Sequence, residues 1–365
     1  MNRRLFIKKS IGGIFAVELG TSFISCGDDA YYLPDDFEKA PKADSHFHYN
    51  VSVDAFLKYA SSVNMHILTI NVDSNEAIDE QFFNAKTLKD KYPGMIDFLG
   101  TFSASEYGNE SFTDKTIAQI EKCMNAGAKG IKIWKNIGMV IKDSTGKYVM
   151  ADNQAFVPVF AYLEKEGIPL VAHLGEPRNC WLPYEQITMG NDLSYYRSHP
   201  EYHMYQHPDA PSYNEQIAAR DHLLDAYPRL KFIGAHIGSL EWNLDEVARR
   251  FDKYPNFTVD LSARMGHVHL HTIENRDKVK NFFNTYQDRI MYGSDTGLGA
   301  VTNIDRQCQS LYNTWRSHWI FLATGETIPA DKFNTANPPT EITGLRLPRS
   351  VVDKIFYSNF KRMFG

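Results

Sequence analysis

Short apolar runs alternate along the chain with longer segments in which apolar residues return every three or four positions. The short runs are rich in residues that favour strands, and the longer segments have the period of amphipathic helices. The predicted strands span residues 43–48, 66–74, 95–104, 128–135, 168–175, 230–238, 257–263 and 290–297.

The predicted helices lie between and after these strands, and several end in Gly or in Tyr-Pro, which are helix stop signals. They span residues 54–63, 76–92, 115–127, 155–167, 215–228, 244–255, 277–287 and 305–325. Eight strand–helix units are the number that closes a parallel (β/α)8 barrel, the TIM barrel. An open doubly wound sheet is the rival fold, but no Gly-rich phosphate loop follows the first strand. The sequence therefore predicts an α/β protein with a single barrel domain over residues 43–365.

Two long connections are expected on the catalytic face of this barrel. Residues 177–212, rich in Tyr, His, Pro and Asn, follow the fifth predicted strand. Residues 323–339 are expected there too if they fold back over the rim. In a TIM barrel, loops after the strands build the active site.

Composition and charge indicate which kind of binding partner to expect. The chain has 365 residues, of which 43% are hydrophobic and 23% charged, as expected for a globular protein with a large core. The net charge is −5 without a long basic run, which argues against nucleic-acid binding and favours a small-molecule substrate.

Cys123, Cys180 and Cys308 have no regular spacing, so we expect small buried side chains and no disulfide framework. The oligomeric state stays open.

Residues 1–26 differ from the rest of the chain. Basic residues at the start precede a weakly apolar stretch that ends in small residues at Cys26. This order is typical of an export signal, and the stretch is too short to span a membrane as a helix. A frayed amphipathic helix is the alternative interpretation.

Two features of this segment suggest the export route. Arg3 and Arg4 resemble a twin-arginine signal, and "FISC" resembles a lipoprotein cleavage box with Cys26 as the acylated residue. Glu18 and Phe23 depart from these patterns. Residues 27–42 are predicted to be a polar tether outside any core. We therefore expect a periplasmic or outer-membrane-anchored lipoprotein that contacts the membrane only through its N-terminal lipid anchor.

Chemically reactive side chains gather at the carboxyl ends of the predicted strands, where TIM barrels place their active sites. They are His46, His48, Lys132, His173, His236, Arg264 and Asp295. Residues i and i+2 point the same way on a strand, so His46 and His48 can both face the barrel axis. The second His-rich motif, residues 267–271, lies beyond strand 7, where a loop or the start of a helix gives no such common direction. We favour a solvated loop for it, with contact to the substrate as the alternative. Each histidine alone is more often structural, but three imidazoles and a carboxylate at strand ends of one barrel suit a divalent ion, zinc first, with manganese or iron as alternatives.

The sequence resembles the amidohydrolase superfamily, and within it the branch called amidohydrolase 2. The resemblance covers residues 43–365 and rests on "DSHFH", "GIKIW", "VAHLG", "GAHIGS", "YGSD" and the closing "LPRSVVDKIFYSNFKRMF". The order of the metal-ligand candidates is a specific signal of this superfamily: an HxH pair, then two single histidines and an Asp on the barrel strands. The branch also lacks a flanking β-sandwich, as this sequence does.

The resemblance implies a role for each matching residue. His46, His48, His173 and Asp295 would bind one divalent metal ion, and His236 would face the substrate as an electrophile or proton donor. Asp295 would also act in catalysis by taking a proton from the metal-activated water and passing it to the leaving group. Asp295 as a turn residue and His236 as a buried structural imidazole are the alternatives.

Lys132 has two interpretations. In binuclear relatives a lysine on strand 4 is carboxylated and bridges two metals. The single-metal branch often keeps this lysine, but there it does not bridge metals. We favour a substrate-binding or structural ammonium. Further candidates for substrate binding follow strand ends, although surface or rim packing is an alternative for each. These candidates are Tyr49, Trp134, Glu176, Arg178 and Arg264.

The predicted activity is that of a metal-dependent hydrolase that cleaves an ester, lactone or amide bond of a small polar, sugar-like substrate. Two alternatives stay open. The first is a metal-dependent non-oxidative decarboxylase of the same superfamily, for which Arg264, Arg178 and Lys132 are the available cations. The second is a non-catalytic barrel that binds carbohydrate.

Overall fold

A computed structural model describes residues 30–365 except 52–53, 75 and 299–302. Nine strands form one parallel sheet in the order β8-β7-β6-β5-β4-β3-β2-β1-β9. They are β1 (Lys42–Tyr49), β2 (Met65–Ile70), β3 (Ile96–Thr101), β4 (Ile131–Ile133), β5 (Leu170–Ala172), β6 (Phe232–Gly234), β7 (Phe257–Asp260), β8 (Ile290–Met291) and β9 (Thr296–Leu298). A short antiparallel pair, β10 (Thr327–Pro329) and β11 (Glu341–Thr343), lies apart from this sheet.

β8 and β9 are two parts of one chain segment, and this segment brings the two edges of the sheet together. β8 pairs with β7, and β9 pairs with β1. Between them, the Ser45 amide donates to the Tyr292 carbonyl (3.0 Å), and the Asp295 amide donates to the His46 carbonyl (2.8 Å). The eighth segment therefore lies between the seventh strand and the first, as in a (β/α)8 barrel. The predicted TIM-barrel fold is confirmed.

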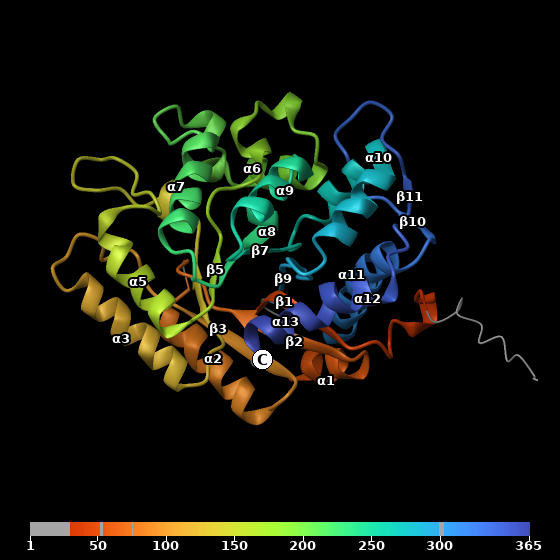
Figure 1. The fold of residues 1–365 in the computed structure, drawn as a ribbon, viewed down its shortest axis with the longest axis horizontal. Coiled ribbons are helices and arrows are strands. Elements are labelled where there is room, and N and C mark those ends of the chain that lie inside the picture. The colour runs from red at the N-terminus through yellow and green to blue at the C-terminus, as the bar shows by residue number, and fades with distance from the viewer. Residues whose placement is uncertain (1–29, 52–53, 75, 299–302) are drawn as a thin grey trace, which may run out of the picture.

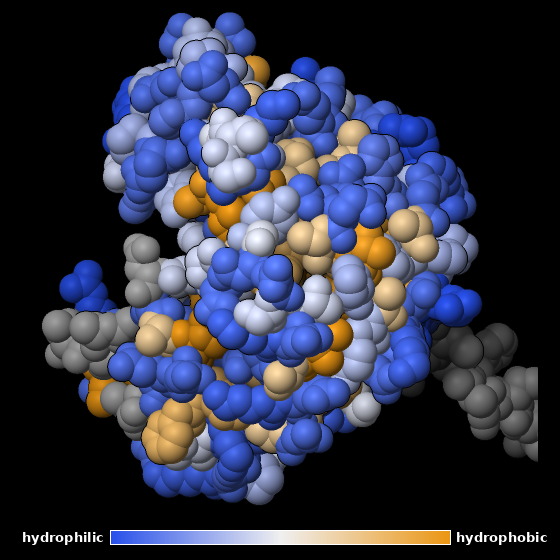
Figure 2. All heavy atoms as spheres, turned by 90° about the vertical axis from the view of Figure 1, so that its left-hand side faces the viewer, coloured by the Kyte–Doolittle hydropathy of each residue, from blue (hydrophilic) through white to orange (hydrophobic). Residues whose placement is uncertain are grey.

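Helices alternate with the strands and surround the sheet (Figure 1). The main ones are α1 (Ala55–Ser62), α2 (Ile78–Lys91), α3 (Phe112–Asn125), α5 (Val157–Glu166), α7 (Tyr213–Ala226), α9 (Leu244–Lys253), α10 (Met265–Thr285) and α11 (Ile304–Ala323). Figure 2 shows the face on the side of α3 and α5, where hydrophilic residues predominate and hydrophobic ones form small separate patches. The apolar sides of these helices pack inward on the strands, which is the expected result of their amphipathic pattern.

Two apolar cores stabilise the barrel. The larger fills the space between the sheet and the helices, and the smaller fills the interior of the barrel. The last helix, α13 (Asn359–Phe364), contributes Phe360 and Phe364 to the interior core. The Phe360 ring lies 5.2 Å from the ring of His66, the second residue of β2, so α13 packs at the amino ends of the strands, opposite the catalytic face.

An irregularity in β1 orients the HxH pair. The register of β1 against β2 shifts between Asp44 and Phe47. Ala43 belongs to the interior core, whereas Phe47 belongs to the outer one. An extra residue at such a bulge changes which side chains face inward. As a result, His46 and His48 both line the cavity at the top of the barrel.

The predicted tether is partly wrong, because its described portion packs on the barrel. Tyr32, Phe37 and Ala40 are buried members of the outer core. The Phe37 ring lies 5.8 Å from Trp319 of α11, between ring centroids. The aromatic residues in this otherwise polar stretch bind it to α11, so residues 30–42 belong to the domain.

Other predictions concern the N-terminal segment and the cysteines. The proposed export signal and Cys26 lie outside the described residues. Within the described part of the chain, no helix has the length and apolar character needed to cross a bilayer. Cys123 and Cys180 are buried free thiols and Cys308 is a partly buried one, as expected of cysteines without a disulfide framework.

Phe37→Ala tests whether the N-terminal segment contributes to stability. Phe37 is 1% exposed. Deleting a buried phenyl ring leaves a cavity, so the free energy of unfolding should fall by about 3–5 kcal/mol in urea denaturation. The control Leu33→Ala removes a side chain that is 67% exposed and should change it by less than about 0.5 kcal/mol. Equal effects of the two changes would contradict this packing.

Candidate metal centre

A cavity of about 670 Å³ opens at the carboxyl ends of the strands. One of the two long connections lines it. Residues 177–212 form α6 (Gly190–Ser198) and several short helices, and the Gly190 amide donates to the Lys332 carbonyl (2.8 Å). The expected position of residues 177–212 on the catalytic face is therefore confirmed, and residues 323–339 contact them at α6. The cavity is lined by His46, His48, Lys132, Trp134, Lys135, His173, Glu176, Asp192, Tyr195, Tyr196, His236, Arg264 and Asp295, among others.

The two histidines of β1 each have one ring nitrogen fixed by the protein. His46 Nδ1 lies 2.8 Å from Asp260 Oδ2, and His48 Nδ1 lies 3.2 Å from the Ile70 carbonyl. Because a carboxylate and a carbonyl only accept, both Nδ1 atoms carry the hydrogen. Burial and the nearby Lys132 lower the pKa of His46, which favours the neutral ring. Each Nε2 atom therefore presents a lone pair, the form in which histidine binds a metal.

These two lone pairs converge on a carboxylate. Asp295 Oδ1 lies 3.4 Å from His46 Nε2 and 3.3 Å from His48 Nε2. Ligand atoms about 2.0–2.1 Å from a tetrahedral zinc ion are about 3.4 Å from one another. Burial opposes the ionisation of Asp295, but the imidazoles of His236, His48 and His46 hold its pKa well below the usual range. The three residues form a candidate metal-binding group, and their spacing fits such an ion.

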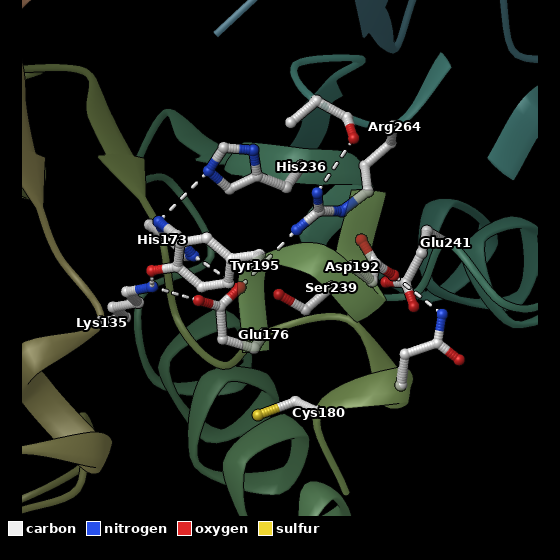
Figure 3. A network of polar contacts seen from close by, with 12 residues as sticks. Lys135, His173, Glu176, Cys180, Asp192, Tyr195, His236, Ser239, Glu241 and Arg264 are labelled. Carbon is white, nitrogen blue, oxygen red and sulfur yellow. Dashed lines mark hydrogen bonds and ion pairs between the residues drawn. The ribbon is translucent and has the colours of Figure 1, made fainter. Parts of the chain in front are cut away.

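The fourth predicted ligand, His173, lies outside this three-residue group. Its Nδ1 is 3.2 Å from His236 Nε2, and its own Nε2 is buried without a hydrogen-bond partner among the described residues. Burial lowers the pKa of both rings well below the usual value. His173 and His236 are therefore two neutral imidazoles in contact with one another (Figure 3), and they line the same cavity as the three-residue group.

His236 is presented by a strained turn. Four successive residues, His236, Ile237, Gly238 and Ser239, have φ values of 60°, 58°, 59° and 56°. Left-handed backbone costs about 1–3 kcal/mol for each residue other than glycine, so the surroundings must hold it. The buried Arg220 donates to the Gly238 carbonyl, and the hydroxyl of Tyr213 donates to the Ser239 carbonyl (2.6 Å). The rigid turn fixes the imidazole at the cavity wall.

Asp260 at the end of β7 connects both histidine motifs, and the sequence analysis missed it. Its Oδ2 binds His46 Nδ1, and its Oδ1 accepts from the amide of His236 (2.8 Å). The hydroxyl of Ser262 also donates to it. Burial opposes ionisation, but His46 and these donors hold the pKa of Asp260 well below the usual range. An acidic residue ending the apolar run "FTVD" was the available signal.

Polar residues form a wall beside the histidines (Figure 3). Lys135 pairs with Glu176 and donates to the Tyr195 hydroxyl (2.9 Å). Burial opposes charge on Lys135, but Glu176 and Tyr195 raise its pKa, so it is an ammonium ion. Arg264 is also buried, and its Nη2 lies 3.7 Å from Glu176 Oε2.

The structure separates the predicted substrate-binding residues into two sets. Trp134, Glu176 and Arg264, like Lys132, line the cavity. Tyr49 and Arg178 do not, so their predicted roles are not supported. Tyr49 follows His48 on the strand and therefore faces outward, where its ring packs against Phe47 and Phe56. Arg178 is exposed and stacks on Trp242 (4.3 Å).

Of the two expectations for residues 267–271, the start of a helix is confirmed and the favoured solvated loop is wrong. These residues form the start of α10, and His267 and His269 are buried. His267 Nε2 lies 3.3 Å from Asp192 of α6, and His269 Nδ1 lies 3.1 Å from Asp331. Helical geometry turns the alternate histidines toward different neighbours, so they connect α10 to both rim segments.

Comparison with known families agrees with this geometry. The sequence matches the family described as amidohydrolase over residues 109–365. The chain belongs to this amidohydrolase family. The predicted resemblance and the prediction of an amidohydrolase-type enzyme are therefore confirmed, and the His/Asp group agrees with metal binding. A search among curated proteins gave no match.

Several solved structures are similar in fold. An uncharacterised TIM-barrel protein from Bordetella bronchiseptica is 12% identical, with a TM-score of 0.50 over 88% of this chain and 98% of that chain. A 5-carboxyvanillate decarboxylase from Sphingomonas paucimobilis is 14% identical, with a TM-score of 0.44 over 86% and 83%. A 4-oxalomesaconate hydratase from Rhodopseudomonas palustris is 11% identical, with a TM-score of 0.46 over 88% and 95%. At such identities the likeness concerns the fold alone.

Asp260→Asn tests whether this carboxylate prepares His46 for metal binding. Loss of the partner that orients a ligating histidine typically weakens metal binding by about 10–100-fold. We expect that loss in chelator-competition titrations with zinc. The control Asp97→Asn removes a partly buried carboxylate that pairs with Lys89 and His66 outside the cavity, and its zinc affinity should equal that of the wild type. Unchanged affinity in Asp260→Asn would contradict the role.

Lys132→Met tests the number of metal ions. Lys132 Nζ lies 3.4 Å from His46 Nε2, and burial lowers the pKa of the amine to about 8. If Lys132 is not a carboxylated bridge, elemental analysis should give about one divalent ion per chain in both wild type and variant. His48→Ala, which removes a predicted ligand, should lower the metal content. A wild type with two ions and a variant with one or none would show that Lys132 bridges two metals.

Proposed function

We propose that the protein is a metal-dependent hydrolase that cleaves an ester, lactone or amide bond of a small polar, sugar-derived substrate. The observation that carries the proposal is the convergence of His46, His48 and Asp295 at the floor of a cavity with a polar wall. The donor set suits zinc, with manganese and iron as alternatives. A bound ion of this kind lowers the pKa of a water molecule and polarises a carbonyl group.

Asp295 is the residue proposed to transfer the proton during hydrolysis. Asp295 is 27% exposed to the cavity and ionised, so it can accept the proton of the attacking water and return it to the leaving group. Oδ1 of this carboxylate belongs with His46 Nε2 and His48 Nε2 to the candidate metal-binding group, so it would bind the ion and leave Oδ2 for the proton.

His236 has a more specific role than the sequence suggested. Its Nδ1 faces two acceptors, the Ser262 carbonyl (3.0 Å) and the Ser262 hydroxyl oxygen (2.9 Å), whose own hydrogen goes to Asp260. Nδ1 therefore carries the ring hydrogen, and Nε2 is an acceptor. Its Nε2 lies 3.2 Å from His173 Nδ1, which donates to it, so we infer that His236 fixes the ring of His173 and donates to a substrate only after it has gained a proton.

The cation arrangement favours hydrolysis over decarboxylation. A decarboxylase must hold the carboxylate of its substrate with a cationic clamp. Of the three cations available for this clamp, Arg178 lies outside the cavity, and Arg264 faces Glu176. Lys132 is left as the single cation of this set without an acidic neighbour within ion-pair distance among the described residues. A carboxylate clamp is therefore incomplete.

The N-terminal sequence supports a location outside the cytoplasm for this activity. Export as a lipoprotein would put the enzyme outside the cytoplasm, where it would trim small nutrients.

A substrate screen tests the reaction class. Zinc-loaded protein is incubated with sugar lactones, simple esters, amides and aromatic acids, while acid release and CO₂ release are followed together. We expect acid release from a lactone or ester, and at least a 100-fold loss of the rate in Asp295→Asn, which removes the proton acceptor (about 10²–10⁴-fold for general base catalysis). CO₂ from an aromatic acid without turnover of any lactone, ester or amide would identify a decarboxylase. Binding of sugars without any turnover would identify a carbohydrate-binding barrel.

A further inference from the structure

Glu176 and Arg264 form an opposed pair that is not fully joined. Both side chains are more than nine-tenths buried, and both line the cavity. The closest atoms, Arg264 Nη2 and Glu176 Oε2, are 3.7 Å apart, beyond the length of a hydrogen bond. Two opposite charges at this depth normally close to a charge-assisted contact of about 2.7–2.9 Å.

Neighbouring groups fix the outer atoms of this pair and leave the inner atoms available. Lys135 holds Glu176 Oε1, and the carbonyl of Ala263 accepts from Arg264 Nη1 (3.0 Å). Among the described residues, neither Glu176 Oε2 nor Arg264 Nη2 has a hydrogen-bond partner. Figure 3 shows the two side chains pointing toward one another beside His173 and His236. The pair thus offers one strong acceptor and one strong donor.

The four charges of this polar wall balance. Lys135 and Arg264 are cations, and Glu176 and Asp192 are anions, whereas Lys132, a further cation of the cavity, lies apart from them beside His46. A carboxylate bound here would meet Glu176, and an ammonium would meet Arg264. A hydroxyl group avoids both conflicts, because it donates to a carboxylate and accepts from a guanidinium at the same time.

We propose that Glu176 and Arg264 form a subsite that recognises a hydroxyl group of a neutral, polyhydroxylated acyl substrate such as an aldonolactone. This rests on the proposed hydrolase function and names its substrate class. Trp134, Tyr195 and Tyr196 line the same cavity and supply the aromatic faces on which the apolar side of a sugar ring can pack. The subsite lies beside His173, so it holds the substrate next to the candidate metal centre.

Paired substrates and paired variants test this subsite. The substrates are D-galactono-1,4-lactone and γ-butyrolactone, which share the ester ring and differ in their hydroxyl groups. The readout is the ratio of their kcat/KM values in the zinc-loaded enzyme. A hydrogen bond to a charged group contributes about 1.5–3 kcal/mol, so the wild type should prefer the hydroxylated lactone by at least about 10-fold.

The variants Glu176→Gln and Arg264→Lys should each reduce this ratio toward one. Arg178→Lys is the matched control, because it makes the same change at an exposed arginine outside the cavity, and its ratio should equal that of the wild type. Thermal melts identify a variant that fails to fold, in which case the other variant decides. A ratio that stays at the wild-type value in a folded Glu176→Gln or Arg264→Lys protein would overturn the subsite.

A binding measurement separates this inference from the proposed reaction. If the wild type hydrolyses neither lactone, titration calorimetry with the neutral hexitol galactitol replaces the kinetic ratio. Binding to the wild type with at least about 10-fold weaker binding to Arg264→Lys would support the subsite although these lactones are not substrates. Absence of galactitol binding to the wild type, or equal binding to both proteins, would overturn the subsite.

Discussion

The organisation of the site depends on one buried carboxylate. Asp260 ends β7 inside the barrel and binds the ring of His46, the amide of His236 and the hydroxyl of Ser262. These contacts set the tautomer of one predicted ligand and anchor the strained turn that presents another imidazole. A buried charge is tolerated only where several donors surround it, so the carboxylate also fixes the relative positions of β1, β6 and β7. The orientation of His46 and the position of the turn at His236 follow from this single group.

Much of this could be predicted from the sequence, because the decisive signals are local. Alternating strand and helix patterns locate the barrel strands within a few residues, and the i, i+2 spacing of His46 and His48 turns both rings inward. Tertiary contacts decide the rest. Nothing near Arg178 indicates that Trp242, which is 64 positions further along, holds its side chain outside the cavity. The burial of Phe37 similarly depends on Trp319, a distant residue of α11.

Asp260 and the motif "HVHLH" show that the prominence of a residue in the sequence does not indicate its importance for the site. A single acidic residue at the end of an apolar strand is a weak signal, yet it holds both His46 and the turn at His236. Three alternate histidines are a conspicuous signal, yet they begin a helix and connect it to the rim. The chemistry of a residue is visible in the sequence, but its partners are visible only once the chain has folded.

The burial of Phe360 and Phe364 inside the barrel determines from which side the substrate reaches the site. Because the interior core occupies the barrel below the metal-binding group, the described residues that line the cavity all come from the carboxyl ends of the strands and the segments that follow them. Substrate binding and product release therefore take place on the same face of the barrel.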